Sequence, residues 1–409
     1  MNYKKVNQCH ISGSKNLEMI LSLGLIPPVN QMSKINQRPK EQLFFPTEIY
    51  YSPVSKLVQL GITVDKKILF PKEYPYTSST TKILRDNFQQ LSEEVLSKFK
   101  IAKEDLVLDV GSNDGNLLSN FKNKTKILGV TPEDIGKLAI EKGIPTILEY
   151  FTEELSNKIL KKYGSAKIIT FTNVFAHIDN INQVLNSIYN LLDEDGVFVS
   201  ESHYLHTLIE QNQYDTIYHE HLRYYSLSSL EYLFQKHNME IIAAKKIETH
   251  GGSIRVYASK KNKYQIEDNY KELIQTEKKD LYCEGLYNFK SKVTDSKLKL
   301  YSLLSEIKLN GLIIYGISAP SRATTLINYL GIKADIIDCI LEIEGSQKIN
   351  HYLPGTDIPI YNEKKLYIDQ PAFALILSWH ISSEIIRNLR KNGFKGKFII
   401  PLPNPTIIE

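Results

Sequence analysis

The chain has 409 residues, more than a single hydrophobic core usually supports, so we expect two or three domains. Its 50 Lys and Arg against 46 Asp and Glu give a net charge of +4, too small and too evenly spread to indicate a nucleic-acid or membrane partner. Three widely spaced cysteines, no apolar signal core behind Met1, and no apolar run near the roughly 20 residues of a membrane helix predict a cytoplasmic protein without a disulfide framework.

Residues 1–75 predict a small N-terminal lobe of strands and turns, because their short apolar runs are broken by prolines at positions 27, 28, 39, 46 and 53. In residues 76–261, helical and strand patterns alternate, with helices near 88–99 and 114–122 and strands at 106–111, 126–131 and 196–201. This alternation predicts a parallel, doubly wound sheet. Strands at 239–249 and 253–259, with Gly251 and Gly252 at their turn, should extend or close it.

Residues 262–309 carry charged and apolar side chains at helical spacing, which predicts a connector of one or two long amphipathic helices. A coiled coil with a partner is the alternative. Residues 310–409 restart the alternation, with strands at 311–316, 334–341 and 373–378 and a helix at 320–330. They predict a second, smaller Rossmann-like domain, so the predicted fold class is α/β with two such domains and a small lobe before them.

The most informative stretch is residues 106–118, LVLDVGSNDGNLL, in which a buried-strand pattern runs into a glycine loop and then a helix. Gly111 and Gly115 admit a ligand close to the main chain, and the new helix offers free N–H groups. The Gly-x-x-x-Gly spacing differs from the Gly-x-Gly-x-x-Gly that seats a pyrophosphate, so an adenosine ligand such as S-adenosylmethionine fits better than NAD. An ordinary strand-helix turn is the alternative. The cofactor-binding residues predicted from this stretch are Asp109, Gly111, Ser112, Asn113, Asp114 and Gly115.

A further strand ends at Phe171, and the residues that follow it, TNVFAH, lie at the carboxyl edge where open α/β sheets bind ligands. We therefore expect Asn173, Val174 and Ala176 at the cofactor and His177 close to it.

The segment YHEHLRYY, residues 218–225, is unusual because every residue except Leu222 is ionisable or phenolic. Few structural segments need that chemistry. The alternative is that His219 and His221 are satisfied polar residues on the two sides of a strand or turn. His203 and His206 are expected to be satisfied surface groups, because no third ligand follows at a regular spacing, and Trp379 and His380 are expected to pack.

Six motifs occur in a characteristic order: DVGSNDGNLL (109–118), TNVFAHI (172–178), YHEHLRYYSL (218–227), HGGSIRVY (250–257), YGISAPSRATTLINYLGI (315–332) and YLPGTDIPI (352–360). Over nearly its whole length the chain resembles the S-adenosylmethionine-dependent sugar C-methyltransferases, which branch deoxysugars carried on a nucleoside diphosphate. The resemblance implies a class I methyltransferase domain of Rossmann-like fold in the centre and a C-terminal Rossmann-like domain that binds the nucleotide-sugar.

Methylation of a carbon beside a sugar ketone needs a base for the C–H and donors for the enolate oxygen. His221 is the predicted base because imidazole titrates near neutrality. Tyr218 and His177 are the predicted donors, and Glu220 is predicted to orient an imidazole. The resemblance implies the same four residues and adds Tyr76, from a segment that closes over the site. Sugar O-methylation, with His221 deprotonating a hydroxyl, is an open alternative.

Other polar residues are predicted to bind the substrate. Arg255 and Tyr257 occupy alternate strand positions and so face one side, where Arg255 could hold a phosphate. The loop at residues 316–322 offers helix N–H groups and Arg322, which suit a diphosphate. The alternatives are a turn role for His250 and a plain strand-helix turn at 316–322. The predicted substrate-binding residues are His219, Arg223, Tyr224, His250, Gly251, Arg255, Tyr257, Ser318, Ala319, Pro320, Ser321 and Arg322.

Two positions depart from the resembled family. Its N-terminal lobe carries a zinc site of two Cys-x-x-Cys pairs, whereas the matching residues here are Cys9, Ser12, Ser52 and Ser55, so we predict no zinc and no other metal. The family also has an acidic residue for the cofactor ribose where this chain has Thr131, followed by Pro132, which predicts a weaker contact. Glu133 is the candidate substitute for that acid.

Two functions of other classes compete with methyl transfer. An NAD-dependent nucleotide-sugar dehydrogenase or epimerase would use Gly316 with Asp338 as the ribose-binding acid. A non-catalytic nucleotide-sugar binding protein would account for the lost zinc ligands and for Thr131. The sequence leaves open the sugar, the ring position, the nucleotide base and the oligomeric state.

Overall fold

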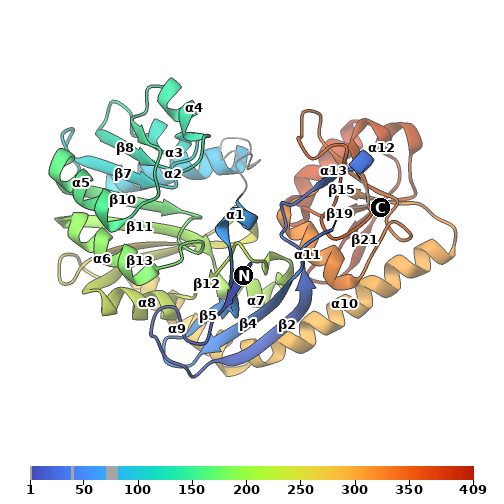
Figure 1. Ribbon diagram of the computed structural model, residues 1–409, viewed down its shortest axis with the longest axis horizontal. Helices are drawn as coiled ribbons and strands as arrows, with labels where there is room; N and C mark the ends of the chain where they lie inside the picture. Colours follow the sequence, from blue (N-terminus) through green and yellow to red (C-terminus); the bar gives the residue numbers. More distant parts are fainter. Residues whose placement is uncertain (1, 38–40, 71–81) are drawn as a thin grey trace.

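A seven-stranded sheet forms the middle of the chain (Figure 1). The computed structural model describes residues 2–37, 41–70 and 82–409, and Tyr76 therefore lies outside the described residues. The sheet has the order β13-β14-β11-β10-β7-β8-β9. Its strands are β7 (Leu106–Val110), β8 (Lys126–Val130), β9 (Thr146–Ile147), β10 (Ala166–Thr172), β11 (Leu192–His203), β13 (Met239–Ile247) and β14 (Ser253–Lys260). Strands β7 to β11 run parallel, and β14 pairs antiparallel with both β11 and β13.

Helices cover both faces of this sheet, because successive residues of each buried strand point to opposite sides. Ile169 of β10 belongs to the core that includes α5 (Glu153–Tyr163), α6 (Ile181–Leu191) and α8 (Leu227–Lys236). Its neighbour Ile168 belongs to the opposite core, with α2 (Lys82–Lys98) and α3 (Asn116–Ser119). A short helix, α4 (Gly136–Glu141), lies between β8 and β9. This arrangement confirms the predicted Rossmann-like fold of the class I methyltransferases.

A four-stranded sheet, in the order β12-β5-β4-β2, forms the N-terminal lobe. It contains β2 (Glu18–Ile26), β4 (Phe45–Ser52) and β5 (Leu57–Leu60), and its edge strand β12 (Arg223–Tyr224) comes from the histidine-rich segment. Strand β1 (Tyr3–Lys5) pairs with β6 (Ile62–Val64), and α1 (Lys66–Leu69) follows. The sequence did not predict β12, because only tertiary pairing with Val58 and Gln59 makes this two-residue segment a strand.

Two helices, α9 (Asp268–Asp280) and α10 (Leu286–Leu309), joined by a π-helical turn at Leu281–Gly285, form the predicted connector. In Figure 1, α10 runs below β2 toward the C-terminal sheet. One continuous core contains Ile49 of the lobe, Phe289 of α10 and Ile340 of the C-terminal sheet, so these parts pack as one body.

The C-terminal sheet has the order β18-β16-β15-β19-β20-β21. Its strands are β15 (Ile314–Ile317), β16 (Cys339–Glu342), β18 (Ile360–Asn362), β19 (Phe373–Ile376), β20 (Lys397–Ile400) and β21 (Thr406–Ile408). The helices are α11 (Ser321–Leu330), α12 (Lys364–Asp369) and α13 (Ser382–Lys391). The strand predicted at 334–341 begins only at Cys339, because the N–H groups of Ile336 and Ile337 donate to Lys333 O in a preceding turn.

Short elements complete the description. They are β3 (Ser33–Lys34), which pairs with β17 (His351–Tyr352), α7 (Leu205–Glu210), and 3-10 turns at Ile35–Gln37, Tyr214–Thr216, Thr249–Gly251 and Trp379–Ile381. Among the described residues, no helix combines the length and apolarity that crossing a membrane requires.

Candidate active site

The glycine loop after β7 adopts left-handed backbone angles at both of its glycines. Gly111 has a φ of 78° and Gly115, at the start of α3, a φ of 75°. A Cβ at Gly111 would lie 2.1 Å from a methyl of Val174, so only glycine fits there. The N–H groups of Gly111 and Ser112 donate to Val130 O at 2.7 and 3.2 Å, which ties the loop to the end of β8.

Three buried polar atoms at or beside this loop have no hydrogen-bond partner among the described residues. They are the Oγ of Ser112, the Nδ2 of Asn116 and the Oδ1 of Asn173. Asn173 is held at a φ of 58° by its N–H, which donates to Glu201 O at 2.8 Å. A glycine loop against Val174 with unpartnered polar atoms beside it fits an adenosyl cofactor, as the sequence predicted.

Asp109 lies beneath this loop. Its side chain is buried and accepts a hydrogen bond of 2.6 Å from Thr170 Oγ1. Burial, opposed by that bond and reinforced by the negative charge of Glu201, raises the pKa of Asp109 to about 7. Asp114, also buried, pairs with Lys142 Nζ at 3.2 Å. Both acids therefore support the loop from below.

His221 and His177 lie side by side at the end of β10, with ring centroids 5.1 Å apart. The turn that carries His221 is fixed there by Leu222 N–H, which donates to Ala176 O at 3.1 Å. Because Val174 contacts Gly111 and His177 N–H bonds Val174 O, the histidines and the cofactor loop share one sheet edge.

The hydrogen bonds of both imidazoles determine which nitrogen carries the proton. His221 Nδ1 lies 2.9 Å from Thr216 O, and His177 Nδ1 lies 2.5 Å from Glu220 O. A carbonyl only accepts, so each Nδ1 donates and each Nε2 keeps its lone pair in the neutral ring. Burial lowers the pKa of His221 to about 3 and also lowers that of His177. Neutral His177 therefore offers an acceptor at Nε2, and the donor role predicted for it requires prior protonation.

Tyr218 and Glu220 complete the predicted catalytic group. The ring of Tyr218 lies 4.2 Å from that of His221. The buried carboxylate of Glu220 accepts 2.7 Å from Asn30 Nδ2, and Asn30 Oδ1 accepts 3.4 Å from Ser321 Oγ. Asn30 thus joins the N-terminal lobe, the catalytic segment and the start of α11. Sequence reasoning missed it, although the Pro27-Pro28 turn just before it was a usable signal.

A row of rings extends from His221 toward the C-terminal domain. His203 lies 5.0 Å from His221 and stacks at 5.6 Å on His250, whose backbone has a φ of 57°. The expectation that His203 is a surface group is wrong, because its ring lies between these two histidines. The Nε2 of His250 is buried and has no partner in the described part of the chain.

Arg322 lies beyond His250. Its guanidinium donates to His250 O at 3.4 Å, contacts His380 Nδ1 at 3.0 Å and pairs with buried Asp215 at 3.6 Å. Trp379 Nε1 donates 2.7 Å to the same carboxylate. His380 and Trp379, expected only to pack, therefore hold Arg322 at the site, and Asp215 is a partner that the sequence analysis overlooked.

The loop before α11 differs from the predicted diphosphate seat. Ala319 N–H donates 2.6 Å to the carboxylate of Glu342, and Lys348 Nζ donates 2.7 Å to Ala319 O. Ser318 has a φ of 62°, with its Oγ donating to Ser378 at 2.7 Å. The carboxylate of Glu342 thus accepts a hydrogen bond from one of the N–H groups that we expected to bind a phosphate, that of Ala319. Pro320 and Ser321 stand at the start of the helix.

Two residues of the histidine-rich segment do not face this site. His219 points into the lobe, where its Nε2 lies 3.0 Å from Thr47 Oγ1 and 3.1 Å from Pro46 O, and its ring contacts Phe45. Arg223 is buried, and its guanidinium donates to Ile178 O and Asp179 O. The predicted substrate roles of both are therefore corrected, because His219 Nε2 bonds the N-terminal lobe and two guanidinium nitrogens of Arg223 bond the loop after β10. Tyr224 stays near His221, with ring centroids 6.3 Å apart.

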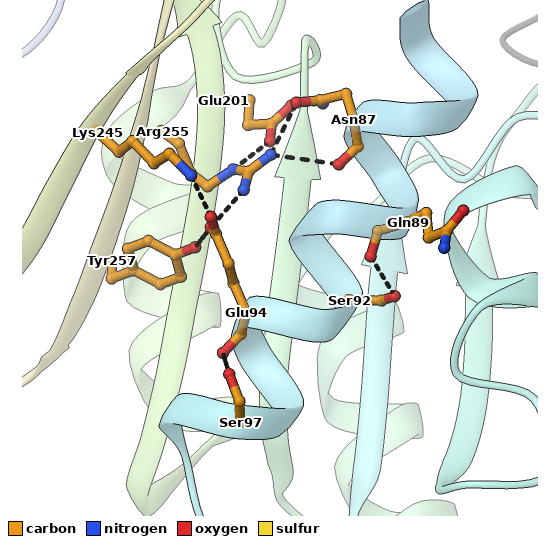
Figure 2. Close-up of polar contacts among 9 residues, drawn as sticks. All are labelled: Asn87, Gln89, Ser92, Glu94, Ser97, Glu201, Lys245, Arg255 and Tyr257. Carbon is orange, nitrogen blue, oxygen red and sulfur yellow. Dashed lines mark hydrogen bonds and ion pairs between the residues drawn. The ribbon is translucent and has the colours of Figure 1, made fainter. Parts of the chain in front are cut away.

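Arg255 and Tyr257 are also corrected, because they face α2 rather than the substrate side (Figure 2). Arg255 is fully buried, and its three nitrogens donate to Glu201, Glu94 and Asn87 at 2.6, 2.6 and 2.8 Å. Tyr257 donates 2.8 Å to Glu94, which also pairs with Lys245. Strand alternation correctly put both on one side, but internal hydrogen bonds and ion pairs engage all three guanidinium nitrogens of Arg255 on that side.

The residues at the family's zinc positions come together without its ligand set. Cys9 Sγ lies 3.0 Å from Ser55 Oγ and accepts from Ser12 N–H at 3.5 Å, and Ser52 is buried nearby in sequence. One thiol with serine hydroxyls does not match the four thiolate or imidazole ligands of structural zinc. Hydrogen bonds of Cys9 with Ser12 and Ser55 therefore hold this part of the lobe together.

Asp338 does not fit the alternative NAD site. Its carboxylate accepts from Lys308 Nζ and from Ile314 N–H, at 3.1 and 3.2 Å, ahead of β16 and thus at the opposite sheet edge from the 316–322 loop. Because a ribose-binding acid must stand at the carboxyl edge, the dehydrogenase hypothesis loses its ribose ligand.

The buried histidines predict how stability depends on pH. Burial lowers the pKa of His219 from 6.5 to about 4. Between these values the unfolded chain binds a proton that the folded chain does not, so the free energy of unfolding falls as pH falls, by about 1.4 kcal/mol per pH unit for each such histidine. His219→Gln should therefore flatten this acid-side slope by about that amount, measured by urea unfolding at pH 7, 6 and 5. Parallel curves for the variant and the natural protein would refute the assignment.

Comparison with known families agrees with this geometry. Residues 77–244 match a family described as a methyltransferase domain, residues 248–403 one described as a C-methyltransferase C-terminal domain, and residues 9–70 one described as a proposed zinc binding domain. The chain is 27% identical to the C-methyltransferase NovU of Streptomyces niveus over 414 residues, 99% of this chain and 98% of that protein.

Solved methyltransferases resemble only part of the chain. An S-adenosylmethionine-dependent methyltransferase of Clostridium acetobutylicum is 16% identical, with a TM-score of 0.30, over 42% of this chain and 98% of its own. Magnesium protoporphyrin IX methyltransferase of Synechocystis is 10% identical, with a TM-score of 0.32, over 42% and 78%. These scores are too low to bear on function. The two methyltransferase family matches, the full-length methyltransferase relative and the adenosyl-type loop together make this chain an S-adenosylmethionine-dependent methyltransferase.

Proposed function

We propose that the enzyme methylates a carbon atom beside the ketone of a deoxysugar carried on a nucleoside diphosphate. Two matches support carbon as the acceptor, because the family of residues 248–403 and the relative from Streptomyces niveus are both described as C-methyltransferases. The observation that carries the proposal is the neutral His221 ring, whose Nδ1 donates to Thr216 O and so leaves the lone pair on Nε2, and whose centroid lies 4.2 Å from that of the Tyr218 ring.

In this proposal His221 Nε2 takes the proton from the sugar carbon and leaves an enolate. A buried imidazole with a lowered pKa is a weak base in its resting state, but the anion formed nearby favours the imidazolium. Tyr218 donates to the enolate oxygen, and Glu220, held by Asn30, fixes the turn through its carbonyl bond to His177. When bound, S-adenosylmethionine supplies the electrophilic methyl group.

We further propose that residues 310–409 hold the nucleotide part of the substrate. Arg322 donates to the carbonyl of His250, and His203 and His250 lie between it and His221. A diphosphate beside Arg322 would put the attached sugar toward His221. Lys348, at the loop before α11, is a second cation that could serve the same anion.

The proposal predicts a product with a new carbon–carbon bond. Incubation with 13C-methyl-labelled S-adenosylmethionine and keto-deoxysugar nucleotides should give a C–CH3 signal in the 13C NMR spectrum. The proton on the carbon next to the ketone should also exchange with deuterated water in the natural enzyme and not in His221→Ala. An O–CH3 signal would instead establish the alternative, sugar O-methylation, in which His221 deprotonates a hydroxyl.

A further inference from the structure

The ribose of a nucleoside cofactor is usually held by a carboxylate at the end of the strand next to the glycine-loop strand. In this fold that strand is β8, because Val130 O accepts the N–H groups of Gly111 and Ser112. The ribose ligand should therefore come from the residues that directly follow Val130.

Thr131, the first of them, is turned inward. It is 1% exposed, and its N–H donates to Ile147 O at 3.0 Å. Its methyl group faces α4, since a Cβ on Gly136 would lie 2.5 Å from it. The Oγ1 hydrogen is already donated, at 2.6 Å, to the carboxylate of Glu133. Thr131 is thus poorly placed to bind a sugar diol itself.

The carboxylate of Glu133 can accept further hydrogen bonds, whereas the hydroxyl hydrogen of Thr131 is already donated. Its side chain is partly exposed, and Thr131 is its only side-chain hydrogen-bond partner among the described residues, with no Lys or Arg paired to it there. A carboxylate accepts about four hydrogen bonds, so most of its lone pairs remain open. The hydrogen bond from Thr131 holds this carboxylate beside the end of β8, where an acidic residue at position 131 would place its own carboxylate.

We propose that Glu133 binds the ribose hydroxyls of S-adenosylmethionine and that Thr131 is a positioning residue that aims its carboxylate. The acidic residue for the ribose would thus stand two positions later in this chain than the position occupied by Thr131. Two acceptor oxygens on one carboxylate match the two adjacent hydroxyls of a ribose, and the negative charge strengthens both bonds.

Isothermal titration of the full-length protein with S-adenosylhomocysteine tests this without any sugar substrate, so its failure is separate from failure of the proposed function. Glu133→Gln should bind about 10- to 100-fold more weakly, the usual worth of hydrogen bonds to a charged group. Thr131→Val should bind about 3- to 10-fold more weakly, because the carboxylate loses its one fixed partner. Glu141→Gln, a matched change on exposed α4, should leave the affinity unchanged.

A ligand lacking one ribose hydroxyl makes the test specific. The natural protein should bind the 2′-deoxy analogue about 10-fold more weakly than S-adenosylhomocysteine itself. In Glu133→Gln the difference in affinity between the two ligands should be less than about 3-fold, because the substitution has already weakened the bond that the missing hydroxyl would make. Full additivity of the two losses, or unchanged affinity of Glu133→Gln in a protein whose circular dichroism spectrum matches the natural one, overturns the proposal. Unchanged affinity of Thr131→Val overturns its positioning role.

Discussion

His221→Ala should lower kcat by about 10²- to 10⁴-fold, the usual contribution of a positioned general base. The fold and S-adenosylhomocysteine binding should persist, because the His221 side chain makes a single hydrogen bond among the described residues, to the backbone carbonyl of Thr216. Steady-state kinetics with a keto-sugar nucleotide gives kcat, and isothermal titration gives the cofactor affinity. A fall confined to kcat and kcat/KM would mark an interaction made in the transition state.

His237→Gln is the matched control for that experiment. His237 is also a buried histidine with two polar partners, Asn186 and Asn182, but it packs between α6 and α8 away from the glycine loop. Its replacement should change the unfolding midpoint and leave kcat within about twofold, since substitutions at sites that are distant and share no partners usually act independently. Equal kcat in His221→Ala and the natural enzyme would remove His221 from the mechanism and make His177, with its own free Nε2, the base to test next.

The second large effect concerns the buried ion pair of Figure 2. Arg255→Met should lower the free energy of unfolding by about 3 to 5 kcal/mol, because it leaves the carboxylate of Glu201 buried without its cation. Both side chains are fully buried, at 0% exposure. Glu201 O also accepts the N–H of Asn173, so loosening β11 should weaken cofactor binding as well. Urea unfolding followed by circular dichroism measures the loss.

Lys245→Met tests whether burial causes that loss. Lys245 pairs with Glu94, as Arg255 does, but its side chain is 41% exposed. Exposed ion pairs contribute about 0 to 1 kcal/mol, so this variant should be nearly neutral. The double variant Arg255→Met with Glu201→Gln should recover part of the stability, because no buried charge is left unpaired. Equal losses in the two single variants would contradict the role assigned to burial.

Local pattern was sufficient to predict six of the seven strands of the central sheet, all but the two-residue strand β9. The strand at 106–111 and the turn at Gly111 are read from a buried run and from backbone freedom, which are properties of neighbouring residues. Parallel pairing then puts the ends of β7 and β10 at one edge, so Asn173 and His177 could be placed near the loop without coordinates. The strand β12 could not be predicted, because its two residues become a strand only by pairing with β5.

Local pattern was insufficient for the direction of side chains in the histidine-rich segment. His219 and His221 have the same chemistry and are two residues apart, yet one docks the N-terminal lobe and the other faces Tyr218. The deciding partners, Thr47 for His219 and Thr216 O for His221, lie in different parts of the chain. Arg255 was misassigned for the same reason, since α2, which supplies Asn87 and Glu94, is more than 160 residues away in the sequence.

By itself, then, the sequence determined the glycine loop after β7, the two α/β sheets and the candidate catalytic segment, because these depend on short-range periodicity and on residue type. Tertiary structure alone decided that His203 joins the histidine row, that Asn30 reaches Glu220, and that the Thr131 hydroxyl donates to the carboxylate of Glu133. Such roles depend on which groups satisfy or desolvate a side chain, and those groups are brought together only when distant segments pack.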